Sequence, residues 1–164
     1  MLTRLSALLT ERERVVARSV LQLEASALDL ERSVIDESGD FLRCRFVAVE
    51  DRHCSFALDF GRGEHDRRFN FFIGLGAEVA NYELLATAGD ALELQLDVQK
   101  FLCSTVEVES HCRNGEVTKE RYRASQLVVD GQPLALWYKR GGVGLFSRHT
   151  VQHRQYAPWI VAGA

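Results

Sequence analysis

The chain has 164 residues, of which 46% are hydrophobic and 26% are charged, and its formal net charge is −3. This length fits a single domain, residues 1–164, that buries about two thirds of its unfolded surface. The composition excludes a disordered chain. The acidic balance argues against nucleic acid as a partner, because proteins that bind phosphates usually carry a basic surplus.

The N-terminal segment bears on where the protein is found. The apolar stretch before Glu11 is too short for a signal peptide, and no run of about 18 apolar residues occurs in the chain. We therefore expect a cytoplasmic protein that does not contact a membrane. Its cysteines include no C-x-x-C pair, so we expect free, mostly packed thiols instead of disulfides or a zinc site. They are Cys44, Cys54, Cys103 and Cys112.

A long helix is predicted near the N-terminus. Thr10 followed by Glu13 matches a capping box, and apolar residues then recur at steps of three and four up to Val34, before Gly39 ends the pattern. A second apolar row on this helix needs cover from either a wrapping sheet or a second copy of the protein. We favour the sheet, and a homodimer stays open. The second row is Leu21, Leu28 and Ile35.

Strands are predicted after Gly39, where the spacing of apolar residues falls to two. Three strands are expected, in the segments 42–48, 54–60 and 69–75. Residues 77–88 fit one face of a helix or one face of a strand, and we favour a short helix.

A longer strand is predicted after the turn at Gly89-Asp90. Apolar residues alternate with polar ones over 92–98, and the alternation continues past Lys100 to Val108. One strand of this length would span about 55 Å, which exceeds the usual length of a strand. We therefore expect a bend or bulge near Lys100.

Two turn dipeptides, Asn114-Gly115 and Asp130-Gly131, are the strongest local signals in the chain. Both tolerate the positive φ angles of type I′ turns, so each predicts a tight hairpin. Beyond them, Val143–Phe146 is a candidate strand, followed by irregular chain through Pro158. The patterns together predict an α+β fold: one long N-terminal helix packed on a large antiparallel β-meander of six to eight strands, either open or curled into a partial barrel.

The register follows from counting outward from the two turns. The first hairpin pairs Val108 with Arg121, and the second pairs Arg123 with Tyr138. Both arginines then lie in phase with an otherwise apolar face. The same count places Glu109 opposite Glu120, where like charges repel. This clash indicates either solvent at that position or a register that is off by one.

Arg121 and Arg123 are the candidate ligand-binding residues, with Trp137 and Tyr138 beside them. A guanidinium on an apolar face needs a partner, and its fork of donors fits a carboxylate or a phosphate. In the alternative interpretation both arginines reach water at the end of the core or pair with carboxylates of the helix.

No motif identifies catalytic, metal-binding or cofactor-binding residues. His149 and His153 have the spacing of a helical metal site, but nearby glycines and alternating residues argue against a helix, so we interpret both as surface histidines. The glycine-rich segments 74–76 and 141–144 match no dinucleotide or P-loop spacing. We assign no catalytic residue and no metal, and we expect no cofactor.

One partial resemblance involves Gly89-Asp90 with the alternating residues that follow, and the hairpin at Asn114-Gly115. This region resembles the strands of hot-dog-fold thioesterases and dehydratases, and Val20–Ala25 is similar to their central helix. The resemblance covers about a third of the chain. It departs from the family before the helix, where those enzymes have a strand and this chain has few residues.

Two functions of different class follow from these observations. The first is a non-catalytic binding protein of the inhibitor, immunity, chaperone or adaptor type, which acts on another protein. The alternative is a protein that binds a small molecule, an amphipathic acid or an acyl thioester, in an apolar pocket next to Arg121 and Arg123. One version of this alternative is a hot-dog-like thioesterase or dehydratase.

Overall fold

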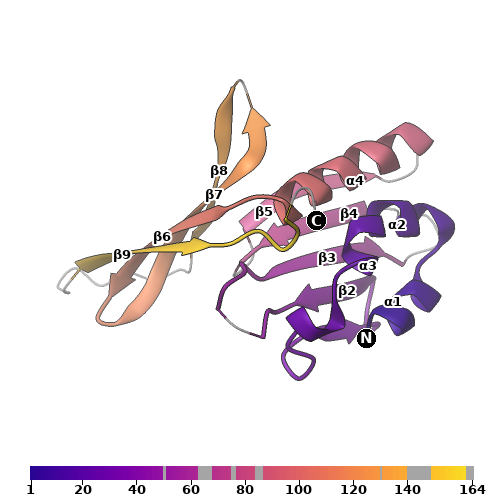
Figure 1. The fold of residues 1–164 in the computed structure, drawn as a ribbon, viewed down its shortest axis with the longest axis horizontal. Helices are drawn as coiled ribbons and strands as arrows, with labels where there is room; N and C mark the ends of the chain where they lie inside the picture. Colours follow the sequence, from indigo (N-terminus) through magenta and orange to yellow (C-terminus); the bar gives the residue numbers. More distant parts are fainter. Residues whose placement is uncertain are drawn as a thin grey trace.

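The computed structural model describes residues 1–49, 51–62, 68–74, 77–83, 87–129, 131–139 and 149–161. Their strands form two antiparallel sheets, a five-stranded one in the order β1-β2-β3-β4-β5 and a four-stranded one in the order β8-β7-β6-β9 (Figure 1). The α+β class and the antiparallel pairing are confirmed. The single meander and the partial barrel are wrong, because the described strands separate into two sheets.

The first sheet is a meander of sequential strands. The three strands expected between residues 42 and 75 are present, but the predicted short helix at 77–88 is wrong, because residues 77–83 form a strand along the edge of β4. This pairing satisfies the backbone hydrogen-bonding groups of β4. The strands are β1 (Val34–Asp36), β2 (Phe41–Phe46), β3 (Phe56–Gly61), β4 (Arg68–Ile73) and β5 (Ala77–Glu83).

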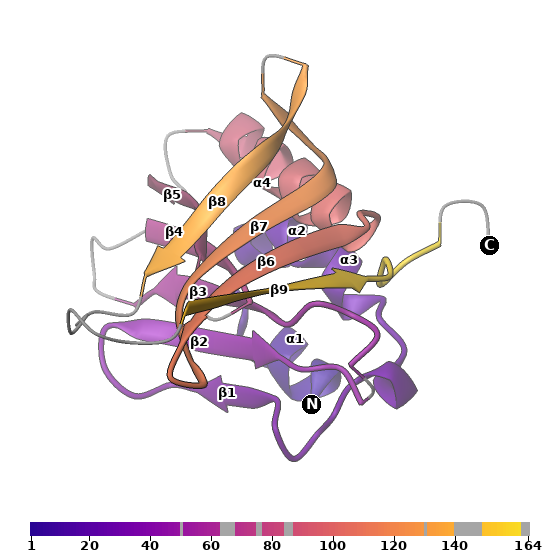
Figure 2. The same ribbon diagram turned by 90° about the vertical axis from the view of Figure 1, so that its left-hand side faces the viewer.

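The helices gather on one side of the first sheet, and α4 also contacts the second sheet (Figure 2). The N-terminal part of this layer consists of three short helices. The predicted single long helix to Val34 is therefore wrong. The capping box of Thr10 and Glu13 is present, but the helices end at Leu21. The helical segments are α1 (Leu2–Leu8), α2 (Glu11–Val16), α3 (Arg18–Leu21), the short 3₁₀ helix η1 (Ala25–Ala27) and α4 (Ala88–Leu102).

Hydrogen bonds to a distant segment replace the predicted helix after Leu21. The Asp29 backbone N–H donates to the Val47 carbonyl at 2.8 Å, and the Ser33 hydroxyl accepts from the Val47 N–H at 2.9 Å. The Asp29 carboxylate also accepts from the N–H groups of Glu31 and Arg32, each at 3.1 Å. Such local side-chain acceptors compete with helix formation. The expected second apolar row therefore never forms on one helix.

The helix α4 occupies the segment for which the alternation predicted a strand at 92–98 and a bend near Lys100. The Thr87 hydroxyl accepts from the Asp90 N–H at 3.3 Å, and the Asp90 carboxylate accepts from the Thr87 N–H at 2.9 Å, which is a complete capping box. The segment is rich in strong helix formers. Its buried residues recur with helical spacing and belong to the hydrophobic core: Ala91, Leu94, Val98, Phe101 and Leu102.

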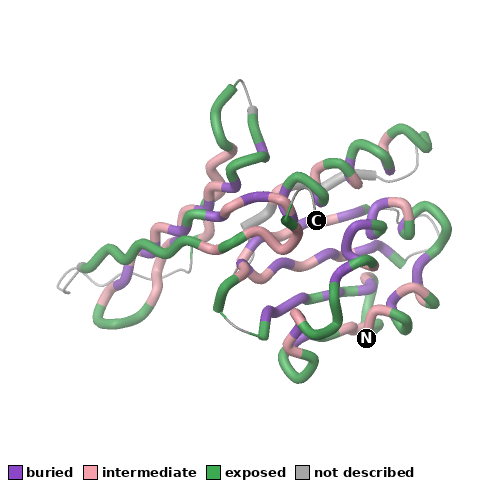
Figure 3. Tube along the Cα trace, in the orientation of Figure 1, coloured by how far each residue is buried: buried purple, intermediate pink, exposed green. Residues whose placement is uncertain are grey.

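Aromatic side chains fill the core between α4 and the first sheet. Phe56 is fully buried, with its ring 4.7 Å from that of Phe46 and 5.4 Å from that of Phe101. Phe101 also contacts Phe71 at 5.4 Å. Burial is therefore concentrated in the first sheet and its helices, whereas much of the second sheet is exposed (Figure 3).

The second sheet contains both predicted hairpins. Asn114 and Gly115 have φ angles of 50° and 84°, and Gly131 has a φ of 76°, as tight hairpin turns require. Residues expected to be irregular form β9, whereas the candidate strand at 143–146 lies outside the described residues. The strands are β6 (Val106–Arg113), β7 (Glu116–Val129), β8 (Gln132–Lys139) and β9 (His149–Tyr156).

Contacts made by Tyr122 and Trp159 help to attach the second sheet to the first. Tyr122 of β7 is buried against Gly74, where φ is +61° and an added Cβ would overlap the tyrosine ring. After β9, the Trp159 indole donates to the carbonyl of Cys54 at 2.9 Å and packs edge-on to Phe56 at 5.6 Å. These contacts fix one side of the second sheet against the core.

Candidate functional site

A β-bulge sets which side of the second sheet carries the candidate arginines. The predicted register holds next to the turn, where Cys112 pairs with Val117, and fails beyond it, where His111 pairs with Lys119. The extra residue is Thr118, whose hydroxyl donates to the His111 carbonyl at 3.0 Å. One additional residue reverses the face of every side chain that follows in β7. The prediction that the arginines lie on an apolar face is therefore wrong.

In the observed pairing Glu109 no longer lies opposite Glu120, so the repulsion expected from the predicted register is absent. Glu109 lies opposite Arg121 and Glu107 lies opposite Arg123, whereas Glu120 points to the buried side. There the Ser110 hydroxyl donates to Glu120 at 2.8 Å. The off-by-one alternative was thus the correct interpretation.

The second hairpin contains a larger irregularity. Val129 pairs with Gln132 next to the turn, as predicted, but Arg123 pairs with Ala135 and not with Tyr138. Between these positions β7 bonds to the loop before β6, where the Ser125 N–H donates to the Thr105 carbonyl at 3.0 Å. The pairing with β8 is interrupted there.

The structure brings together three of the four candidate residues. Arg121 pairs directly with Trp137, and Arg123 lies two residues along the same strand and on the same face. Tyr138 is on the opposite face, half-buried against the core. Tyr138 therefore does not lie beside Arg121, Arg123 and Trp137.

We call the side of the second sheet that points away from the core the outer face. Basic side chains follow one another along β7, and glutamates lie beside them on β6. The residues of the outer face include Lys119, Arg121, Arg123, Glu107, Glu109, His111, Trp137, Lys139, Val151, His153 and Gln155.

Trp137 is the aromatic centre of the outer face and is 44% exposed. The Lys119 ammonium lies 3.5 Å from the ring centroid, and the Arg121 guanidinium lies 5.2 Å from it. The His111 ring is 6.3 Å away. Cation–π attraction holds these cations at the ring, so the aromatic group is oriented before any partner arrives.

Glu109 supplies a fixed negative charge next to the arginines. The ring Nε2 of His111 lies 2.8 Å from its carboxylate. This hydrogen bond, together with the charges of His111, His153 and Arg121, lowers the pKa of Glu109. The carboxylate is therefore ionised at neutral pH.

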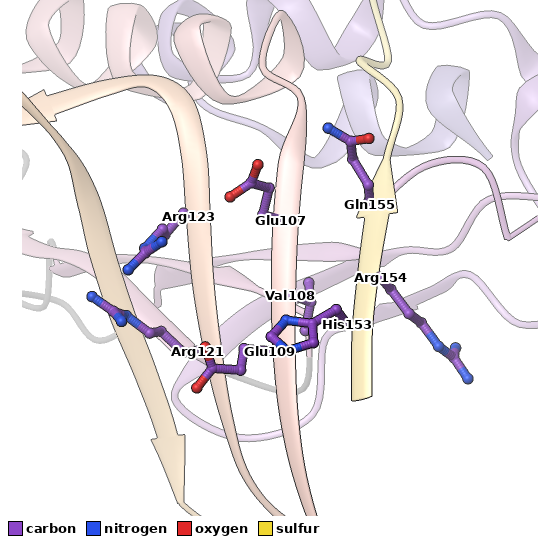
Figure 4. A pocket seen from close by; sticks show the side chains of 8 residues that line it. All are labelled: Glu107, Val108, Glu109, Arg121, Arg123, His153, Arg154 and Gln155. Carbon is purple, nitrogen blue, oxygen red and sulfur yellow. The ribbon is translucent and has the colours of Figure 1, made fainter. Parts of the chain in front are cut away.

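Two adjoining hollows open on the outer face, with volumes of about 380 Å³ and 610 Å³. Arg121, Arg123, Glu107 and Gln155 line both of them. Figure 4 shows the two arginine side chains extending to the same side of β7, away from β6. The larger hollow continues toward Gln132 and Pro133 at the start of β8.

The arginines have no ionic partner within the part of the chain that the structure describes. Neither forms a salt bridge there, and the Nε of Arg121 is buried without a hydrogen-bond acceptor. Buried donors are normally satisfied. The arrangement can therefore accept an anionic group from outside.

Cys54 is not an activated nucleophile. Burial, with a smaller contribution from the Glu120 charge, raises the pKa of Cys54 to about 12. The adjacent His53 is occupied elsewhere, because it stacks on Trp159 and its Nδ1 lies 3.1 Å from the Ala157 carbonyl. The four thiols are free, as expected, and three are buried. Cys54 is therefore a protonated core thiol at neutral pH.

The described residues contain no group of three or more His, Cys, Asp or Glu side chains that could hold a metal ion. Among the same residues, no helix is long and apolar enough to cross a membrane. His153 is exposed on the outer face, as predicted for a surface histidine, and it lies on a strand.

Sequence reasoning missed Lys119 and His111 as neighbours of Trp137. A signal was present, because Arg121 and Arg123 alternate with the less polar Tyr122 and Ala124. Strict alternation of this kind indicates a strand with its basic residues on the outside. The register counted from the turn at Asn114-Gly115 instead places both arginines on the apolar face.

The comparisons with known proteins add no further assignment. No family model, curated protein or solved structure matches this chain. The hot-dog resemblance also loses its basis, since the alternating residues after Gly89 belong to α4 and the helix near Val20 ends at Leu21.

Proposed function

We propose that this chain is a non-catalytic cytoplasmic binding protein, of the inhibitor, immunity, chaperone or adaptor type, whose outer face contacts another protein. The observation that carries this proposal is the exposed Trp137, held between Lys119 and Arg121 on a sheet. Tryptophan and arginine are enriched at the centres of protein–protein interfaces.

Rigidity adds to the argument. Side chains on paired strands lose less conformational freedom on binding than side chains on loops, so more of the contact energy remains as affinity. The opposite side of the same strands is fixed by the contact of Tyr122 with Gly74. The core between α4 and the first sheet is filled by aromatic rings, which favours a surface interaction over an enclosed ligand.

Photo-crosslinking in source cells tests this function. A photoreactive amino acid replaces Val151, which is 44% exposed on the outer face, and in a matched control it replaces the exposed Arg12 on α2. We expect a discrete adduct with another protein at Val151 and none at Arg12. The captured protein, once purified, should bind wild type with a defined stoichiometry and lose affinity for Trp137→Ala. Equal adducts at both positions, or none, would contradict the proposal.

A small anionic ligand is a second candidate, favoured by the two hollows that share Arg121 and Arg123. An amphipathic acid would place its carboxylate at the guanidinium groups and its apolar part against Pro133. Native mass spectrometry of the protein purified from its source would detect a bound molecule. A mass equal to that of the bare chain would count against this candidate.

A further inference from the structure

Arg121 and Arg123 form an incomplete ionic site. Within the described part of the chain neither forms a salt bridge, and the buried Nε of Arg121 lacks an acceptor. Glu109 and Glu107 lie opposite them on β6, yet neither completes an ion pair with them. The guanidinium groups line open hollows, and a guanidinium fork matches a carboxylate with two parallel hydrogen bonds.

The spacing of the two arginines matches an extended peptide. They are two residues apart on β7, so their Cα atoms are separated by about 7 Å. Alternate side chains of an extended segment repeat at the same distance. Both arginines also line both hollows of the outer face. A segment lying across the face can therefore present one carboxylate to each guanidinium.

The neighbouring charges select a peptide over a nucleic acid. The ionised Glu109, with Glu107 beside it, forms a negative row directly next to the arginine row. A phosphate backbone crossing the face would meet that row as well, whereas a peptide can offer it backbone N–H groups or basic side chains. The exposed ring of Trp137 adds a surface for an apolar side chain.

We infer that the protein partner docks an acidic extended segment on the outer face, with two carboxylates at alternate positions held by Arg121 and Arg123. This inference rests on the proposed function, because it names the part of the partner that is recognised. Lys119 extends the basic row by one further position on β7. The segment crosses beside Trp137, which contacts its uncharged side chains.

The chain's two tryptophans provide the measurement. Trp137 is on the outer face, whereas Trp159 is half-buried and donates its indole N–H to the Cys54 carbonyl. In ¹⁵N-labelled protein, an outer-face ligand should move the indole resonance of Trp137, assigned with Trp137→Phe, and leave that of Trp159 in place. The probe is a peptide of about twelve residues in which Glu alternates with Thr. Its control carries Gln at every Glu.

We expect the Glu peptide to shift Trp137 saturably and to bind at least about tenfold more tightly than the Gln peptide. Added salt should weaken the binding. The variant Arg121→Gln with Arg123→Gln should lose about tenfold or more in affinity. The matched control, Arg12→Gln with Arg18→Gln on the exposed helical side, should bind as wild type does. If the double variant loses its Trp159 signal, the single variant Arg123→Gln takes its place.

Three outcomes would overturn the inference: no shift of Trp137, equal binding of the Glu and Gln peptides, or tighter binding of an oligouridylate of the same length. The crosslinking experiment at Val151 separates this inference from the proposed function. A partner captured equally well by wild type and by the arginine double variant would leave the proposed function standing and refute the acidic segment.

Discussion

The two sheets bury different kinds of side chain, and the difference indicates how the molecule divides stability from recognition. The face of the first sheet toward α4 is packed with phenylalanines such as Phe56 and Phe71. The second sheet buries a mixed surface that includes Glu120, which accepts hydrogen bonds from Ser110 and Tyr122. Apolar burial is the larger favourable term in folding, so we assign most of the stability to the first sheet.

The outer face of the second sheet can therefore be charged at little cost to the fold. Its side chains do not form the core, and Trp137 and Val151 remain 44% exposed. Replacing them should change binding more than stability. The predictions below test this division between the two sheets, beginning with the largest expected change in the free energy of unfolding.

The core of the first sheet should be the most sensitive region. Phe56→Ala removes a fully buried ring that contacts Phe46, Phe101 and Trp159, and should lower the free energy of unfolding by about 4 kcal/mol. Urea denaturation followed by circular dichroism measures this loss. The matched aromatic truncation on the outer face, Trp137→Ala, should cost less than about 1 kcal/mol. Similar losses for both variants would contradict the division.

The junction between the sheets should come second. Gly74→Ala places a Cβ within the ring of Tyr122 and forces alanine into a φ of +61°, so we expect a loss of about 3 kcal/mol in stability. Part of that loss is the overlap itself. In a Tyr122→Ala background the same change should cost only about 1 kcal/mol, for the backbone strain. An equal cost in both backgrounds would show that the two sheets are not in contact here.

The N-terminus of α4 should give a smaller effect. Thr87→Ala removes the acceptor for the Asp90 N–H and should cost about 1 kcal/mol of stability. Thr87→Ser keeps the hydroxyl and should behave nearly as wild type does. Chemical denaturation compares the two variants directly. If serine and alanine destabilise equally, the capping hydrogen bond contributes nothing.

A comparison of α4 with α2 shows which helices could be predicted from the sequence. The Thr10 capping box was visible because it is local and precedes a helical spacing. Thr87 and Asp90 form an equivalent box, but Leu92, Leu94 and Leu96 also alternate with polar residues, and this period of two favours a strand. The buried set that includes Leu94, Val98 and Phe101 has helical spacing, so the correct helix was present in the sequence as the competing pattern.

The composition of the outer face is harder to predict, because two irregularities in strand pairing determine which side chains lie on it. The turns fix the pairing next to Gly115 and Gly131, but a bulge at Thr118 and a break before Val128 change the pairing farther along the strands. A single inserted residue reverses a face. Pairs such as Arg121 with Trp137 therefore do not follow from the sequence. The repulsion between Glu109 and Glu120, in contrast, is visible in the sequence and indicates that the predicted register is off by one.

The smallest effect tests the organisation of the outer face itself. Lys119 lies 3.5 Å from the centroid of Trp137, at an exposed site where a cation–π contact contributes about 0.5 kcal/mol. A double-mutant cycle with Lys119→Met and Trp137→Leu isolates this coupling, because both replacements keep apolar bulk. The matched cycle pairs Lys139→Met with Trp137→Leu. Lys139 belongs to the same strand as Trp137 but makes no described contact with its ring, so its coupling should be close to zero. Equal couplings in the two cycles would mean that Trp137 is not held in place by Lys119, and the rigidity assigned to the recognition surface would then have to come from the strands alone.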